Sequence, residues 1–110
     1  MILSLIKMNA APGKRQSILE VLRFVADQIR VKTGCADCAV YEARDQRHTI
    51  LYVEQWRTRE ELDRHIRSDL YFRILAAMEL SGGPPEVYFD HVSTTEGMEL
   101  IERSRRRDET

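Results

Sequence analysis

Hydrophobic and polar residues alternate along the chain in strand-like and helix-like patterns, and the first two segments are the clearest. Residues 2–8 are rich in β-forming side chains and run into the turn residues of segment 9–13, which predicts a strand. In residues 14–32 the apolar positions follow one face of a helix, with charged residues opposite. This predicts a helix that covers one side of a sheet. Its apolar face consists of Ile18, Leu19, Leu22, Val25, Ala26 and Ile29.

Two further strands are predicted in residues 38–43 and 49–56, joined by a polar stretch that is typical of a hairpin loop. In the second of these strands, apolar residues occur on both sides of the alternation. We therefore expect both faces of the sheet to be covered, at least in part. The two sets are Tyr52, Glu54 and Trp56 on one side and Leu51 and Val53 on the other.

The second half of the chain predicts a helix with a break in it. Thr58 and Glu61 have the spacing of a capping box, which starts a helix. The helical spacing of apolar residues is interrupted at residues 67–69, where we expect a bend or break in the helix. The sequence Ser-Gly-Gly-Pro-Pro at residues 81–85 then ends the helix.

A last strand in residues 86–92 and a short, charged helix in residues 98–107 complete the pattern. The order strand, helix, two strands, helix, strand is the β-α-β-β-α-β motif of the ferredoxin-like α+β fold with an antiparallel sheet. We divide the chain into a ferredoxin-like domain, residues 1–93, and a C-terminal helical tail, residues 94–110.

Two helices can cover only one face of the predicted four-stranded sheet. We place Ile50, Tyr52 and Trp56 on the other face, where they would expose a larger apolar patch than monomers tolerate. Pairing of two copies through these faces removes the patch. We therefore expect a symmetric homodimer through the sheet face.

Composition excludes several classes of protein. With 110 residues, 43% of them hydrophobic and 32% charged, the chain is expected to form one globular core. The net charge of -1 provides no positive field that would attract nucleic acid. The N-terminal apolar run is too short for a signal peptide, and no run reaches the ~18 residues of a membrane span. We expect a cytoplasmic protein without a membrane partner.

Cys35 and Cys38 have the C-x-x-C spacing of redox and zinc sites. A zinc site needs a second pair of ligands, and a thioredoxin-type site opens a helix, whereas this motif leads into a strand. A disulfide between the two would close almost no loop. We therefore expect two thiols and no metal.

Residues 52–69 contain Glu-x-Trp, then Leu-x-x-His, then Ser. This segment resembles the signature of antibiotic biosynthesis monooxygenase domains, including small quinol oxygenases, and the resemblance extends over residues 1–93. It implies a dimeric α+β barrel in which each subunit holds an apolar pocket between sheet and helices. Some members oxidise electron-rich aromatics or quinols with O2 and no metal or flavin. Others degrade haem, and others rearrange small signalling molecules.

Cofactor-free oxygenation requires a base inside an apolar pocket that excludes water. We predict that His65 is this base, since its unperturbed pKa of about 6.5 leaves a neutral imidazole at cytoplasmic pH. The resemblance implies that Tyr71 lines the same pocket. A bond from His65 to a backbone carbonyl and core packing of Tyr71 remain open alternatives. The neighbours predicted to bind substrate are Asn9, Glu54, Trp56 and Phe72.

The resemblance also bears on cofactors. The iron-binding His of haem-degrading members falls near Leu75 of this chain, so no haem and no other cofactor is expected. Glu54 is expected to be a buried acid paired with Arg57, Arg59 or a backbone amide. Trp56 is expected to fill the core or the dimer interface.

These expectations combine into a cofactor-independent monooxygenase that acts with O2 on a small aromatic, phenolic or quinol-like molecule. A non-enzymatic dimeric module for ligand binding or stress response on the same scaffold is the open alternative, because a fold does not determine a function.

Overall fold

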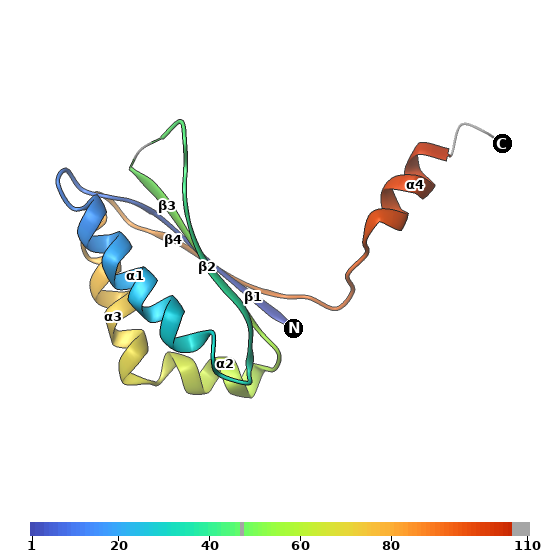
Figure 1. The fold of residues 1–110 in the computed structure, drawn as a ribbon, viewed down its shortest axis with the longest axis horizontal. Coiled ribbons are helices and arrows are strands. Elements are labelled where there is room, and N and C mark those ends of the chain that lie inside the picture. Colours follow the sequence, from blue (N-terminus) through green and yellow to red (C-terminus); the bar gives the residue numbers. More distant parts are fainter. Residues whose placement is uncertain (47, 107–110) are drawn as a thin grey trace.

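The computed structural model describes residues 1–46 and 48–106 and shows one antiparallel sheet with helices against one face (Figure 1). Its elements are β1 (Ile2–Asn9), α1 (Arg15–Ile29), β2 (Cys35–Glu42), β3 (Thr49–Trp56), α2 (Arg59–Ile66), α3 (Asp69–Met78), β4 (Glu86–His91) and α4 (Met98–Arg106).

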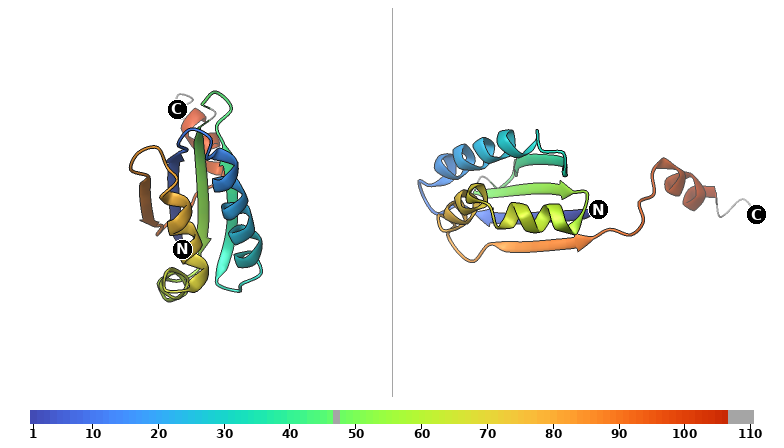
Figure 2. Two further views of the ribbon diagram at one scale, coloured as in Figure 1. Left: turned by 90° about the vertical axis from the view of Figure 1, so that its left-hand side faces the viewer. Right: turned by 90° about the horizontal axis from the view of Figure 1, so that it is seen from below.

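The sheet has four strands in the order β2-β3-β1-β4, and every neighbouring pair is antiparallel. Helices α1, α2 and α3 lie on one face of this sheet, and none of the described helices covers the other face (Figures 1 and 2). This is the ferredoxin-like arrangement that the element order predicts, with the additional C-terminal helix α4. The predicted fold class is confirmed.

Most predicted boundaries hold to within a few residues, and two differences are informative. Strand β2 begins at Cys35, three residues before the predicted start, because Cys35 pairs with Trp56 before an irregularity at Asp37. Helix α1 ends at Ile29 rather than continuing to residue 32. Arg107, the last residue of the predicted C-terminal helix, lies outside the described residues.

The predicted break between the second and third helices is confirmed. Helix α2 ends at Ile66, and α3 begins at Asp69 with Ser68 as its N-cap. At the start of α2, the Thr58 hydroxyl accepts a hydrogen bond from the backbone N–H of Glu61 at 3.2 Å. The Glu61 carboxylate accepts from Arg64 at 2.9 Å.

The core lies between the sheet and the three helices. The six predicted apolar positions of α1 are all buried. On the sheet, alternate positions of β1 and β3 are buried in register, because residues that pair across two antiparallel strands share a face. Ile2 thus pairs with Trp56, and Ile6 with Tyr52.

The predicted placement of Ile50, Tyr52 and Trp56 on the uncovered face is wrong. These side chains are 0%, 0% and 1% exposed, because their register partners on β1 face the helices and so do they. The uncovered face is nevertheless apolar at its centre, where Leu5 pairs with Val53. Its apolar residues, called here the open face, are Leu3, Leu5, Ala39, Tyr41, Leu51, Val53 and Tyr88.

Beyond His91 the chain leaves the body as an arm that ends in α4, and every residue of α4 is exposed. Figure 1 shows α4 on the side of the sheet that faces away from α1, α2 and α3. Within the described ranges, no helix combines the length and the hydrophobicity needed for a bilayer span.

Candidate functional site

A cluster of polar and aromatic side chains is buried between β3 and the pair of helices α2 and α3. Strand β3 supplies its acid, Glu54, and α2 supplies His65. Glu54 is 1% exposed and His65 is 2% exposed, so both belong to the small set of buried polar residues of the protein. Charged side chains are rarely buried unless they are paired. The cluster, called here the Glu54 cluster, contains Tyr52, Glu54, Trp56, His65 and Tyr71.

Glu54 accepts hydrogen bonds at both carboxylate oxygens. The Tyr52 hydroxyl donates to Oε2 at 2.6 Å, and the indole N–H of Trp56 donates to Oε1 at 2.9 Å. His65 Nε2 lies 2.9 Å from Oε2. These bonds replace the water that the acid loses on burial.

The predicted arginine partners of Glu54 are wrong. Arg57 bonds the backbone carbonyl of Thr33 at 3.0 Å, and Arg59 bonds the Asp63 carboxylate at 2.8 Å. Both arginines lie at exposed positions after the end of β3, whereas Glu54 points under the helices. The partners that Glu54 does have come from β3, through Tyr52 and Trp56, and from α2, through His65.

His65 is held between two aromatic rings. The Trp56 indole stacks on it with centroids 4.6 Å apart and an interplanar angle of 28°, and Tyr71 meets it edge-on at 5.1 Å. A carboxylate acceptor at Nε2 favours the tautomer with its proton on that nitrogen. Nδ1 then carries a lone pair. Nδ1 is buried and has no hydrogen-bond partner among the described residues.

Burial of the cluster keeps its acidic hydroxyls and thiol protonated. Burial, followed by the nearby charge of Glu54, raises the pKa of Tyr71 to about 12. The same two causes raise the pKa of Tyr52 beyond its ordinary range. Burial also raises the pKa of the Cys38 thiol to about 12, partly opposed by its hydrogen bond to Tyr52.

The two cysteines are free thiols on β2, and both are buried. Cys38 donates to the Tyr52 oxygen at 3.4 Å, which extends the hydrogen-bond chain that ends at Glu54. Cys35 donates to the backbone carbonyl of Asp37 at 3.3 Å, and burial raises its pKa. In the described part of the chain, no group of three or more His, Cys, Asp and Glu side chains is arranged to hold a metal.

Ser68 determines how His65 and Tyr71 meet. Its hydroxyl donates to the backbone carbonyl of His65 at 2.6 Å and accepts from the backbone N–H of Tyr71 at 3.3 Å. One side chain thus ends α2 and starts α3, and it fixes the bend that brings the two rings together.

Several contributors to the cluster were not predicted from the sequence. Tyr52, Cys38 and Ser68 have the contacts described above, and Ser4 pairs in register with Glu54. Ser4 is 1% exposed, and its hydroxyl has no partner among the described residues. A serine at an inward position of an apolar strand is the signal that could have identified it.

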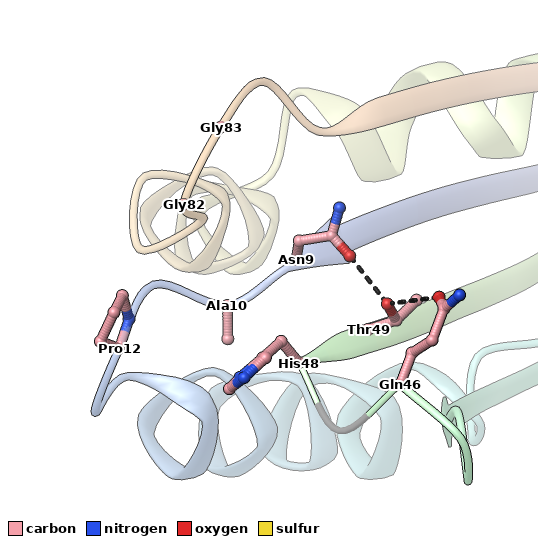
Figure 3. Close-up of a pocket in the computed structure, with 8 residues that line it drawn as sticks. All are labelled: Asn9, Ala10, Pro12, Gln46, His48, Thr49, Gly82 and Gly83. Atoms are coloured by element: carbon pink, nitrogen blue, oxygen red, sulfur yellow. Dashed lines mark hydrogen bonds between the residues drawn. The ribbon is translucent and has the colours of Figure 1, made fainter.

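Two predicted site residues lie away from the Glu54 cluster. Asn9 ends β1, where its side-chain amide oxygen Oδ1 accepts from the Thr49 hydroxyl at 2.8 Å. It lines an open pocket of about 490 Å³ together with Gln46, His48 and the Gly82 turn (Figure 3). Phe72 is 71% exposed on the outer side of α3. The structure therefore brings together Glu54, Trp56, His65 and Tyr71 but not Asn9 or Phe72.

A groove of about 320 Å³ runs between α2 and β4 beside the cluster. Its wall residue Phe89 pairs with Ser4, and Ser4 pairs on its other side with Glu54. The groove is thus separated from the carboxylate by a single strand. Its lining residues are Arg59, Leu62, Asp63, Ile66, Phe89 and His91.

Comparison with known proteins identifies the family. The model of the family described as antibiotic biosynthesis monooxygenase matches residues 1–77, which include the whole Glu54 cluster. The chain belongs to the antibiotic biosynthesis monooxygenase family. The match ends before β4 and α4, so the arm lies outside the part that the family model recognises.

Solved structures support the fold of this family member. Rv0793 from Mycobacterium tuberculosis is 22% identical with a TM-score of 0.78, over 87% of this chain and 98% of that one. A proposed antibiotic biosynthesis monooxygenase from Deinococcus radiodurans is 18% identical with a TM-score of 0.78, over 88% and 97%. A conserved protein from Methanosarcina mazei is 24% identical with a TM-score of 0.75, over 82% and 90%. No curated protein matches the chain.

Proposed function

We propose that this member of the antibiotic biosynthesis monooxygenase family is a cofactor-independent monooxygenase that acts with O2 on a small phenolic or quinol-like molecule. The observation that carries the proposal is the buried pair of Glu54 and His65 with a free Nδ1. A carboxylate that holds one imidazole nitrogen leaves the other as an oriented base, as in hydrolytic triads. The family name supports oxygen chemistry for such a base.

In the proposed reaction, His65 Nδ1 takes the hydroxyl proton of the substrate, and Glu54 stabilises the imidazolium that forms. The phenolate is electron-rich enough to reduce O2. One oxygen atom becomes the new carbonyl of the quinone, and the other leaves as water with the two hydrogens of the phenol O–H and ring C–H. The substrate supplies all the electrons.

We place the entry for the substrate at the groove between α2 and β4, because the groove lies one strand away from Glu54. Nδ1 has no solvent contact in the closed fold, so a substrate reaches it only when α2 moves away from the sheet. The break at Ser68 separates α2 from α3, and we propose that α2 moves about this point. Exclusion of water by re-closure protects the anion from protonation.

We also propose that the protein acts in the cytoplasm as a homodimer through the open face. The predicted dimer rested on three residues that are in fact buried under the helices, but the open face supplies an equivalent set. Leu5 and Val53 lie at its centre, and Tyr41 and Tyr88 flank them at 53% and 50% exposure. A continuous apolar surface of this kind marks an interface.

The proposal is tested by oxygen uptake of the metal-stripped protein with dihydroxynaphthalenes, hydroquinones and anthrones. We expect uptake by the wild type and a fall of roughly 10²-fold or more in His65→Ala, the usual loss when a general base is removed. His48→Ala is the matched control, since His48 is exposed in the pocket of Figure 3. Equal uptake by His65→Ala and the wild type would exclude His65 as the base.

A non-enzymatic binding module is the second candidate, and one observation favours it. Ser4 Oγ and His65 Nδ1 are both buried without a hydrogen-bond partner among the described residues, as expected for two polar groups that bind a ligand without acting on it. Under this alternative, the same phenols bind under anaerobic conditions but no oxygen is consumed above the uncatalysed rate. Calorimetric titration without O2, run beside the uptake assay, separates the two functions.

A further inference from the structure

Helix α4 has apolar side chains that do not pack against its own subunit. It is 9 residues long, below the ~12–15 residues that make an isolated helix stable in water. Its apolar residues Met98, Leu100 and Ile101 are 68%, 43% and 53% exposed. A helix this short and this exposed needs tertiary contacts to persist.

The apolar residues of α4 share one side. With 100° per residue, Met98, Leu100 and Ile101 fall within an arc of about 160°. The same arc also contains Ser104 and Arg105, whereas the opposite arc is entirely charged. The opposite arc consists of Glu99, Glu102, Arg103 and Arg106. This division is typical of a helix that packs one face against a protein surface.

Strand β4 has apolar side chains that the helices of its own subunit leave exposed. The inward side chains of the other three strands lie under α1, α2 and α3, but those of β4 do not. Val87 and Phe89, which pair with Ile6 and Ser4 and so face the helix layer, are each 38% exposed. Ile66, on the other wall of the groove between α2 and β4, is also 38% exposed. One helix is missing from the layer at this edge.

The direction of the arm decides which copy supplies that helix. Figure 1 shows α4 beyond the end of β4 and on the side of the open face, away from the groove of its own subunit. A second copy packed on the open face occupies that side, with the two sheets about 10 Å apart. Residues 92–97 give the arm a reach of about 20 Å before α4 begins.

We propose that the two subunits exchange their arms, so that α4 of each subunit packs into the groove between α2 and β4 of the other. The inference rests on the proposed homodimer and goes beyond it. Met98 and Ile101 then cover Phe89 and Ile66 of the partner copy, and a two-fold axis makes the exchange reciprocal. Because this groove is the proposed substrate entry, each subunit closes the site of its neighbour.

Photocrosslinking of the full chain tests the exchange. We replace Ile101 with p-benzoylphenylalanine, and in a control chain we replace Arg103, on the charged arc. Irradiation is expected to give covalent dimers from the Ile101 variant and few from the Arg103 control. Mass spectrometry should place the crosslink in residues 59–66 or 86–91. Crosslinks within one chain, or equal dimer yields from both variants, would overturn the exchange.

Sedimentation of the same samples separates this inference from the dimer on which it rests. A dimer that gives no inter-chain crosslink disproves the arm exchange and leaves the open-face dimer intact. A monomer disproves both. The double variant Met98→Gln, Ile101→Gln should raise the dimer dissociation constant at least about tenfold, since two buried apolar side chains are lost from each arm. An unchanged constant would count against the exchange.

Discussion

The Nε2 atom of His65 lies 2.9 Å from Oε2 of Glu54, and both side chains are sealed between the sheet and the helices. The pair couples β3 to α2 through their side chains. The same two residues that we propose for proton transfer therefore also hold α2 in place. Stability and activity should change together when this pair is altered.

Glu54→Gln is expected to lower the free energy of unfolding by about 1–3 kcal/mol, the usual loss when buried donors lose their acceptor. The carboxylate accepts from three donors, whereas an amide offers one oxygen and sets its own N–H₂ against Tyr52 or Trp56. Urea unfolding followed by the fluorescence of Trp56, the single tryptophan, measures the change.

The control for this substitution is Glu86→Gln. Glu86 accepts a hydrogen bond from Tyr88 at 2.9 Å, but both residues lie on the exposed edge strand. Surface changes of this kind alter stability by less than about 0.5 kcal/mol. A loss in Glu54→Gln no larger than that in Glu86→Gln would show that the cluster does not depend on the carboxylate.

Alkaline pH should destabilise the protein through Cys38. Its pKa is raised from 9.0 to about 12 in the folded state, so below pH 9 both states keep the proton and Cys38 adds no pH dependence. Between pH 9 and 12 the unfolded chain loses the proton and the folded one does not. The free energy of unfolding must then fall as pH rises.

Cys38→Ser isolates this contribution, because a serine hydroxyl can donate to Tyr52 without titrating in this range. Urea midpoints of the wild type and the variant should be compared at pH 8, 9, 10 and 10.5. We expect the wild type to lose more stability than the variant over this interval. Parallel curves would mean that Cys38 is already accessible to solvent in the folded state.

The sequence was sufficient for the fold but not for the partners of Glu54. Periodicity locates helices and strands because it depends only on which face is buried, and the break before Ser68 followed from the same rule. Periodicity does not say which face of β3 the helices cover, and this is why Trp56 was placed on the wrong side. The open face is nearly as apolar as the covered one, so the pattern of β3 alone could not distinguish them.

The site residues could likewise be predicted only where the sequence alone indicates which side chains meet. Glu54, Trp56 and His65 were selected from a motif and Tyr71 from the family resemblance, and the fold brings all four together. Asn9 was selected because haem-degrading members of the family use an Asn near this position, and Phe72 because it follows Tyr71. Asn9 ends a strand and Phe72 lies on the outer face of α3, so neither reaches the cluster. The register of β1 and β3 places Ser4 beside Glu54. Such contacts between strands depend on tertiary structure and are difficult to predict from the sequence.

Ser68→Ala is expected to lower the free energy of unfolding by about 1 kcal/mol, as for the loss of a helix N-cap. It also releases the backbone carbonyl of His65, which should allow α2 to move. Under the proposed mechanism, this variant should show a changed KM as well as lower stability. Ser17→Ala in α1 is the control, since Ser17 is an exposed helix residue. Equal effects of the two substitutions would remove Ser68 from this role.

The open face offers the sharpest test of the homodimer. Val53 pairs with Leu5 at its centre, so Val53→Lys would bring two buried ammonium groups together across a two-fold interface. We expect this variant to sediment as a monomer at concentrations where the wild type is dimeric, with its far-UV circular dichroism unchanged. Val31→Lys is the matched control, because Val31 is 83% exposed just beyond the end of α1. If Val53→Lys remains as dimeric as Val31→Lys, the open face is not the interface, and the arms would then have no second subunit on that side to bind.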